Sequence, residues 1–403
     1  GSSKFGANNR YGNFWSAGLG WNIHNESFVT SSKIDILKIR GSLGYTGKVN
    51  FSPFQAMTMY QFSGDLEYLN GIGAVPQGIG NEDLGWEREL SYNLGTDISL
   101  FDRRLNFTFD IYLKKTTDLV LDASRAPSTG TTSAKENIGE MENKGLEFQV
   151  DGMLVQRNDF YWQVAATGSM NRNRILKINS ALKKANEDAN KVDSKTPLAQ
   201  YEEGESTTAL KVVKSAGIDP ATGQEVFIKL NGERTFEYSA DDKFVIGDTE
   251  PRFRGTVSTN LFYKGFSLYL LGRYECGAYL YNETRATKVE GANPKKNADK
   301  RVFDSRWKNP GDIAFYKDIA DSDGWGTNPK HSDRFVEKEN VFTLGTVNFG
   351  YEFGQSICSK IGVRNLRVGV NLTDIVRWSN VKIERGTTYL YSNGFEFTLS
   401  TTF

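Results

Sequence analysis

The sequence predicts an all-β chain: an antiparallel sheet of about eleven strands that crosses a membrane as part of a β-barrel. Three observations support this prediction. Apolar and polar residues alternate over many segments, the connections between the segments are alternately short and long, and aromatic residues make up 13% of the chain. Aromatic side chains favour strands, and strict alternation gives a strand one apolar and one polar face.

The alternation is clearest in residues 105–113. Every second residue there is apolar, namely Leu105, Phe107, Phe109, Ile111 and Leu113. The residues between them are Asn106, Thr108, Asp110 and Tyr112. Residues 86–100 repeat the pattern, and only Asp102 and Arg103 separate the two segments. The pair therefore predicts an antiparallel hairpin with a tight turn.

The connections between such segments differ in length in a regular way. Strands are predicted near 15–23, 37–45, 86–100, 105–113, 146–154, 162–170, 253–263, 266–274, 347–353, 366–372 and 395–403. Short connections lie near 24–33, 101–103, 156–159, 264–265 and 354–362, and long ones near 47–84, 119–137, 175–250, 282–335 and 377–392. Bacterial outer-membrane barrels combine short periplasmic turns with long extracellular loops, so the short side is expected to be periplasmic.

A soluble β-sandwich or propeller is the main alternative, because alternation alone suits both kinds of protein. Loop asymmetry favours the membrane barrel, and so do aromatic residues at strand ends, where interfacial girdles form. These aromatic residues are Trp86, Tyr263, Phe266, Phe353 and Phe403. An odd strand number does not close an ordinary bacterial barrel, so we expect the chain to be one section of a larger wall.

Composition limits the other classes. Lys plus Arg and Asp plus Glu are both 49, so no basic excess points to nucleic acid. The mean hydropathy is −0.49, and no run approaches the roughly 18 apolar residues of a membrane helix. Barrel strands expose every second residue to lipid, which keeps the average hydropathy low.

Several distinctive motifs are spread over the chain. In order, they are GSSKFG (1–6) with NRYG (9–12), LKIRGSLGYTG (37–47), NEDLGWE (81–87), IGEMENKGLE (138–147), AGIDPATG (216–223), IGDTEP (246–251) with YKGF (263–266), and RGTTY (385–389) with the final Phe403. Together they resemble the motifs of SusC/RagA-like TonB-dependent outer-membrane transporters. The resemblance implies the C-terminal half of a 22-stranded barrel over residues 1–403, with the plug domain and the N-terminal barrel half absent.

The resemblance also implies a function. Such a barrel is a multi-pass protein of the bacterial outer membrane that imports oligosaccharides or peptides, energised by TonB through the plug, under a SusD-like surface lipoprotein. It is not an enzyme. Two other hypotheses stay open: the same barrel as a folding substrate of the outer-membrane assembly machinery, and a soluble β-rich binding or adhesion protein.

Aromatic residues of the long connections are candidates for contact with ligand or partner, because aromatic faces stack on sugars and bury well against proteins. Packing within the loops is the simpler interpretation. The candidates are Tyr60, Phe62, Tyr68, Tyr201, Tyr238, Tyr279, Tyr281, Trp307 and Trp325. Charges of both signs are expected on the lumen face, where a solvated wall is the simpler interpretation. They are Glu87, Glu89, Glu147, Asp151, Arg254, Arg273, Glu275 and Arg367.

Metal and thiol chemistry have little support. Asp318, Asp321 and Asp323 are a weak candidate for a structural calcium site, because they lack the further ligands of a calcium loop; no other cofactor is expected. His24 and His331 are expected on opposite sides of the membrane, which leaves no catalytic pair. Cys276 and Cys358 are placed near opposite ends of the wall, so no disulfide is predicted.

The last strand has alternating apolar residues and ends in phenylalanine. The residues concerned are Phe395, Phe397, Leu399 and Phe403. They resemble the signal that the outer-membrane assembly machinery recognises, for which strand addition at an open edge is the physical reason. A plain closing strand is the simpler interpretation, and both roles are compatible.

Overall fold

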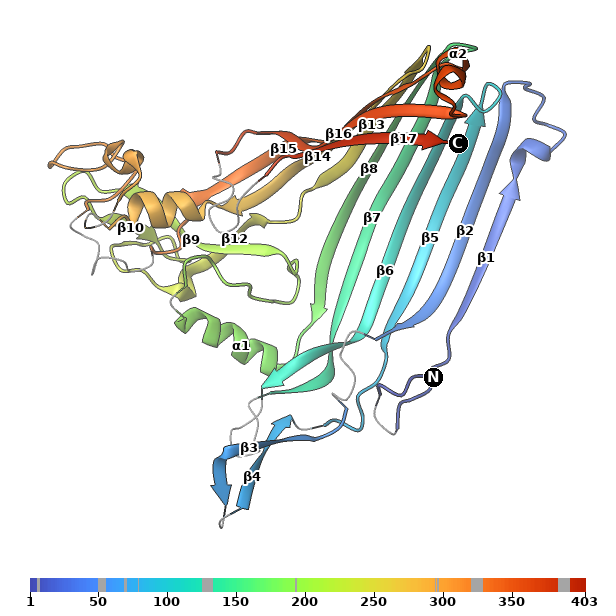
Figure 1. Cartoon of the computed structure of the whole chain (residues 1–403). Helices are drawn as coiled ribbons and strands as arrows, with labels where there is room; N and C mark the ends of the chain where they lie inside the picture. The colour runs from blue at the N-terminus through green and yellow to red at the C-terminus, as the bar shows by residue number, and fades with distance from the viewer. Residues whose placement is uncertain are drawn as a thin grey trace.

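The computed structural model describes residues 1–5, 8–49, 56–68, 71–78, 80–124, 133–192, 194–293, 295, 297–319, 329–382 and 392–403. Its main feature is one antiparallel sheet of 11 strands, curved into a wall (Figure 1). In spatial order the strands are β1 (Trp15–Asn22), β2 (Ile34–Lys48), β5 (Glu87–Leu100), β6 (Leu105–Ser124), β7 (Ser133–Arg157), β8 (Phe160–Lys177), β13 (Phe253–Tyr263), β14 (Phe266–Tyr281), β15 (Val336–Glu352), β16 (Asn365–Ser379) and β17 (Gly394–Thr402). The predicted strand number and pairing are confirmed.

Short turns join the strands at one end of the wall, which we call the turn end; the other end is the outer end. One of the two-residue turns is Lys264–Gly265 between β13 and β14, with φ of 45° and 90°. Two consecutive positive φ values match the twist of paired strands, and glycine adopts the second without strain. At the turn end α2 (Gln355–Cys358) and two 3-10 helices, η1 (Ile23–Asn25) and η7 (Ser359–Ile361), complete the connections.

The two faces of the wall differ as the alternation predicts. On the polar face, Arg40 of β2 reaches over β5 to Asp110 of β6, and Arg273 of β14 reaches over β15 to Asp374 of β16. Gly95 lies between Arg40 and Asp110, and Gly345 lies beside Arg273, so no side chain of the intervening strand blocks these pairs. In a transmembrane barrel the polar face lines the interior, so we call the polar face the inner face and the apolar face the outward face.

The outward face carries an aromatic row near the turn end. Phe160 packs edge-on against Tyr263, with ring centroids 6.0 Å apart, and Phe266 lies 4.5 Å from Tyr351. Directly paired residues share a face, so the register places these four rings side by side. Tyr263 and Phe266 thus lie where a membrane–water interface is expected.

The long connections at the outer end are folded rather than plain loops, which the sequence did not reveal. Between β2 and β5 lies a hairpin of β3 (Met59–Tyr68) and β4 (Gly71–Gly78). Between β8 and β13 lie α1 (Ser180–Lys191) and a 4-stranded sheet of β9 (Ala209–Ile218), β10 (Glu225–Ile228), β11 (Arg234–Thr235) and β12 (Lys243–Asp248), with the 3-10 helix η3 (Ala240–Asp242). The segment between β14 and β15 holds a π-helix, η4 (Arg285–Glu290), and two 3-10 helices, η5 (Lys300–Phe303) and η6 (Asp333–Phe335).

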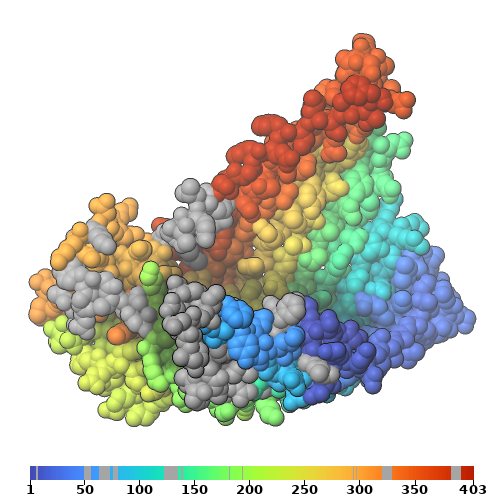
Figure 2. Space-filling model, turned by 60° about the horizontal axis from the view of Figure 1, so that its bottom comes forward, coloured from blue at the N-terminus to red at the C-terminus, as the bar shows by residue number. Residues whose placement is uncertain are grey.

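We call the described parts of residues 178–252 and 282–335 the outer-loop unit. Figure 2 shows this unit on one side of the outer end and the N-terminal segment on the other. One expected connection was placed too wide: residues 119–124 and 133–137 belong to β6 and β7, not to the loop near 119–137. Burial of Val120 against Phe5 and Leu84 favours the longer strands, and alternation alone does not report such a contact.

Apolar cores lie at the outer end instead of along the wall. One contains Phe5, Ala56, Leu84 and Val120, and another contains Ala286, Val289, Tyr316 and Phe335. None of the helices in the described ranges is both long and apolar enough to span a membrane. Cys276 and Cys358 are both free in the structure.

Candidate functional site

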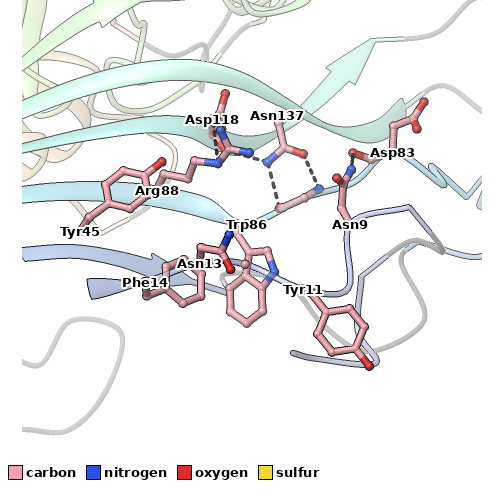
Figure 3. Close-up of a pocket in the computed structure, with 12 residues that line it drawn as sticks. Asn9, Tyr11, Asn13, Phe14, Tyr45, Asp83, Trp86, Arg88, Asp118 and Asn137 are labelled. Carbon is pink, nitrogen blue, oxygen red and sulfur yellow. Dashed lines mark hydrogen bonds and ion pairs between the residues drawn. The ribbon is translucent and has the colours of Figure 1, made fainter. Parts of the chain in front are cut away.

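A pocket of about 480 Å³ opens at the outer end of β2, β5, β6 and β7 (Figure 3). Three of the motifs, NRYG, LKIRGSLGYTG and NEDLGWE, contribute to its lining, together with residues outside any motif. The labelled residues are Asn9, Tyr11, Asn13, Phe14, Tyr45, Asp83, Trp86, Arg88, Asp118 and Asn137. The ring of Phe5 lies 4.2 Å from that of Trp86, so the first motif of the chain packs on the NEDLGWE segment.

Asn137 holds the pocket together. Its side chain accepts from the Gly85 N–H at 2.8 Å and donates to the Gly85 and Asp118 carbonyls at 3.0 and 2.8 Å. Both sides of the amide are thereby satisfied, which fixes β5 against the outer ends of β6 and β7. Trp86 Nε1 is fully buried and has no partner among the described residues.

The outer-loop unit is built around a buried ion cluster. Arg334 makes paired bonds to Glu225 at 2.6 and 2.7 Å and to Glu290 at 2.8 Å, and all three side chains are at most 6% exposed. These carboxylates raise the pKa of Arg334 despite its burial, so it stays charged. Nearby, the buried Arg306 donates to the carbonyls of Val302 and Val289 among others.

The GIDPATG loop positions Trp307. Within the loop, Asp219 accepts from the Thr222 hydroxyl at 2.6 Å and from its N–H at 3.1 Å. Trp307 Nε1 donates to the Pro220 carbonyl at 2.9 Å, and its ring covers Gly223. This part of the motif is a structural anchor for the segment between β14 and β15.

Two polar clefts flank Lys243 of β12. One, of about 500 Å³, lies between α1 and β9, and the other, of about 340 Å³, lies beside Tyr238 and His331. The Lys243 ammonium and the Gln200 amide both donate to Asn190 Oδ1, at 2.9 and 2.7 Å. Burial, followed by repulsion from Lys211, lowers the pKa of Lys243. Burial likewise raises the pKa of Tyr238 to about 12.

The aromatic candidates fall into different settings. Trp307 and Tyr281 are largely buried, Tyr281 against Phe335 and the His331 ring. Tyr238 packs edge-on against Phe227 and also lines the smaller cleft. Tyr279 packs over Gly247 of β12.

The remaining loop candidates are less enclosed. Tyr60 and Phe62 lie exposed on β3, and Tyr68 ends that strand. The backbone of Tyr201 is held by Asn186 of α1. Trp325, Asp321 and Asp323 lie outside the described residues. The Asp318 N–H donates to the Gly223 carbonyl, and no cluster of metal-ligating side chains occurs in the described ranges.

The expected lumen charges are mostly engaged with the wall itself. Glu87 accepts from the Val120 N–H, Glu89 pairs with Lys48, and Asp151 accepts from Asn106. Arg254 pairs with Glu250, Arg273 with Asp374, and Arg367 donates to Ser267. Glu147 and Glu275 lie on the same face by register.

The two histidines lie at opposite ends of the wall. His24 Nδ1 contacts the backbone of Leu37 near the turn end, whereas His331 Nε2 lies 3.0 Å from the Ser194 carbonyl in the outer-loop unit.

On β17, the side chains of Phe395, Phe397 and Leu399 are exposed, and Phe403 follows the strand.

A family model described as TonB dependent receptor-like, beta-barrel matches residues 1–295. This chain belongs to that family of outer-membrane receptors and transporters. Among its relatives, TonB-dependent receptor P39 of Formosa agariphila is 27% identical over 94% of this chain and 40% of the relative. TonB-dependent receptor SusC of Bacteroides thetaiotaomicron is 32% identical, over 44% of this chain and 18% of the relative. The chain spans about two fifths of the length of the curated relatives that it matches over most of its sequence.

The TonB-dependent fold is confirmed by solved structures. The RagAB peptide importer in its open-open state superposes with a TM-score of 0.80 at 22% identity, over 100% of this chain and 44% of that one. A structure of the RagAB peptide transporter gives 0.79 at 23% identity, over 94% and 41%. The SusC and RagA resemblance inferred from the motifs is therefore correct.

Sequence reasoning missed the buried cluster of Arg334, Glu225 and Glu290. These residues are far apart in the chain, and only the fold of the outer-loop unit brings them together. The one local signal is that Glu225 lies two residues after the GIDPATG motif.

Proposed function

We propose that this chain forms part of the wall and mouth of an outer-membrane nutrient importer that takes up oligosaccharides or peptides. The observation that carries the proposal is the wall itself, in a chain of the TonB-dependent receptor family. It has a polar, ion-paired inner face and an apolar outward face with an aromatic row at its turn end. A water-filled passage bounded by lipid needs these two surfaces.

In this proposal the importer draws its energy from TonB through a plug domain, and a SusD-like lipoprotein covers the outer end. The outer-loop unit is the region that such a lipoprotein would contact. We propose no catalytic role and no cofactor. A structural cation at Asp318, Asp321 and Asp323 stays a prediction.

The two polar clefts are the proposed place of substrate contact in this chain. They combine amide, ammonium and carboxylate groups with the Tyr238 ring, a set that hydrogen-bonds both sugars and peptide backbones. Tyr60 and Phe62, which are exposed on β3, and Tyr238, which lines the smaller cleft, are aromatic candidates with accessible positions. Trp307 and Tyr281 are proposed to support the mouth from within.

A gene deletion in the native host tests the proposal. Growth is measured with a defined peptide mixture or an oligosaccharide mixture as the only carbon source, with and without the full-length gene restored. We expect loss of growth on one mixture and normal growth on monosaccharides or amino acids. Unchanged growth and unchanged uptake of both labelled mixtures would refute the importer function.

The exposed residues of β17 favour a second, compatible role in assembly. We propose that Phe395, Phe397, Leu399 and Phe403 present the strand to the outer-membrane assembly machinery, because β17 has an edge unpaired within the described residues. Phe397→Ser with Phe403→Ser should lower the amount of full-length protein in the outer membrane. Phe303→Ser, at an equally exposed phenylalanine of the outer-loop unit, is the matched control and should leave that amount unchanged.

A further inference from the structure

The outward face of the wall has an apolar hollow over β1, β2, β5 and β6. It has a volume of about 830 Å³, and we call it the apolar groove. Its outward side chains are those of Ala17, Leu19, Leu43, Tyr92, Leu94, Ile111 and Leu113, with Lys144 at its outer margin. The hollow arises at Gly41, which the register places between Leu19 and Leu94. A Cβ on Gly41 would come no closer than 4.0 Å to any atom beyond its chain neighbours, so the space is open.

Cations border the groove on its outer side. The register runs from Leu113 to Lys144 and Arg172, and one row farther out from Lys115 to Glu142 and Arg174. Paired residues share a face, so all of these side chains point outward. We call Lys115, Lys144, Arg172 and Arg174 the rim cations.

Carboxylates compensate only part of this charge. Lys115 lies 3.2 Å from Glu140, and Lys144 lies 3.8 Å from Glu142. Arg172 and Arg174 form no ion pair with any described residue, and both are exposed. Four cations against two carboxylates leave the rim positive, directly beside an apolar hollow on a face that the proposed function turns toward lipid.

We propose that the apolar groove and the rim cations bind a phosphate-bearing acyl lipid of the outer leaflet. An acyl chain would lie in the groove past Gly41, and its phosphate would reach Lys144, Arg172 and Arg174. Guanidinium groups bind phosphate oxygens in pairs, and basic residues at a membrane surface attract anionic headgroups. A sugar or peptide substrate is too polar to fill an apolar groove. A symmetric second copy would place two sets of rim cations side by side, where they would repel each other.

A second groove on the same face supports the assignment by contrast. It measures about 380 Å³ near the turn end and is lined by Phe349, Tyr351, Val368, Gly369, Val370, Phe397, Thr398 and Leu399. None of these residues is charged. Any apolar hollow can accept an acyl chain, but only the first groove pairs the hollow with cations that recognise phosphate.

The inference rests on the proposed membrane location of the wall and is tested with the full-length protein in detergent. Native mass spectrometry would count bound dioleoyl phosphatidic acid and, in parallel, dioleoylglycerol, which has the same chains without phosphate. We expect the phosphate-bearing lipid to bind about tenfold tighter or more. The triple variant Lys144→Gln, Arg172→Gln, Arg174→Gln should lose this preference.

Two further variants separate the parts of the site. Gly41→Leu should fill the groove and weaken both lipids. The triple variant Lys264→Gln, Lys360→Gln, Arg364→Gln removes the same charge at the turn end and should bind like the unchanged protein. Equal binding of both lipids, or equal loss in both triple variants, would overturn the inference.

The same sample distinguishes failure of the inference from failure of the proposed function. A protein that needs detergent and supports uptake, but shows no lipid preference, refutes only the lipid site. A protein that stays monomeric in buffer without detergent refutes the membrane wall and the lipid site together. Dimers that form through the groove and exclude lipid would assign the surface to a second copy instead.

Discussion

Arg334 stabilises the outer-loop unit from a position that solvent does not reach. Its guanidinium links Glu225 of β10 to Glu290 of the π-helix and also donates to the Phe315 carbonyl. Removing one member of a buried ion cluster leaves an uncompensated charge, which costs far more than losing an exposed pair.

We therefore expect Arg334→Met to lower the free energy of unfolding of the outer-loop unit by about 3–5 kcal/mol. Glu233→Gln breaks an exposed pair with Lys229 and should leave that free energy of unfolding nearly unchanged, because solvent screens an exposed pair. Hydrogen exchange of β9 and β10 in the full-length protein measures both. Equal protection in the two variants would show that the cluster carries no stability.

Tyr238 makes the same unit sensitive to alkaline pH. Burial raises the pKa of its hydroxyl from 10.0 to about 12 in the folded state, with a further contribution from Glu225. Between these values the unfolded chain binds fewer protons than the folded one, so stability falls as pH rises. The contribution is complete below pH 10 and is lost toward pH 12.

Tyr238→Phe removes this titration. We expect the stability of the outer-loop unit to fall less steeply from pH 10 to pH 12 in the variant than in the unchanged protein. Hydrogen exchange at fixed temperature across this range gives the comparison. Identical slopes would mean that another group controls alkaline unfolding.

At the scale of elements, the turn around Gly223 joins two long connections of the chain. It lies between β8 and β13 and contacts Trp307, which lies between β14 and β15. Its φ is +74°, and a Cβ there would lie 2.5 Å from the Trp307 ring. Gly232 has a φ of +88° but nothing within 4 Å of the same position. Both glycines have a positive φ, but only Gly223 lies against the Trp307 ring.

Gly223→Ala should therefore destabilise the outer-loop unit more than Gly232→Ala, by about 1–3 kcal/mol, because only the first displaces a packed side chain. Increased exchange at the Gly311 N–H, which bonds to Pro220, would report the displacement. If both variants behave alike, the strain of the left-handed backbone is the whole effect.

The strands were predictable and the folded connections were not. In segments such as Leu105–Leu113, alternate residues face different surroundings. The resulting periodicity can therefore be seen within a single short stretch of sequence. The four-stranded sheet β9–β12 and the cluster at Arg334 depend on contacts between distant segments. Trp307 was identifiable only as a loop aromatic, with packing within the loop as the simpler interpretation, and its contacts with the Pro220 carbonyl and Gly223 come from the fold.

At the scale of the whole molecule, several of the motifs used for recognition meet at the outer end. Phe5 of GSSKFG packs on Trp86 of NEDLGWE. Asn137, directly before IGEMENKGLE, bonds to Gly85 beside Trp86 (Figure 3). The wall needs only alternation, which many sequences satisfy. These contacts need specific residues, so these motifs report how the outer end is built.

The chain spans about two fifths of its curated relatives, and a wall of 11 strands fits one section of a larger barrel. The proposed uptake, TonB coupling and lipoprotein contact are therefore to be tested with the full-length protein.

The central claim is that the outward face of this wall meets lipid while the inner face meets water. Nitroxide labels placed singly at Ser91, Tyr92, Asn93 and Leu94 of β5 test it in the full-length protein in bilayers, with Cys276 and Cys358 replaced by serine. We predict that dissolved oxygen relaxes the labels at Tyr92 and Leu94, and that a water-soluble nickel complex relaxes those at Ser91 and Asn93. Nickel access at all four positions, or access of neither reagent at Tyr92 and Leu94, would contradict the membrane wall.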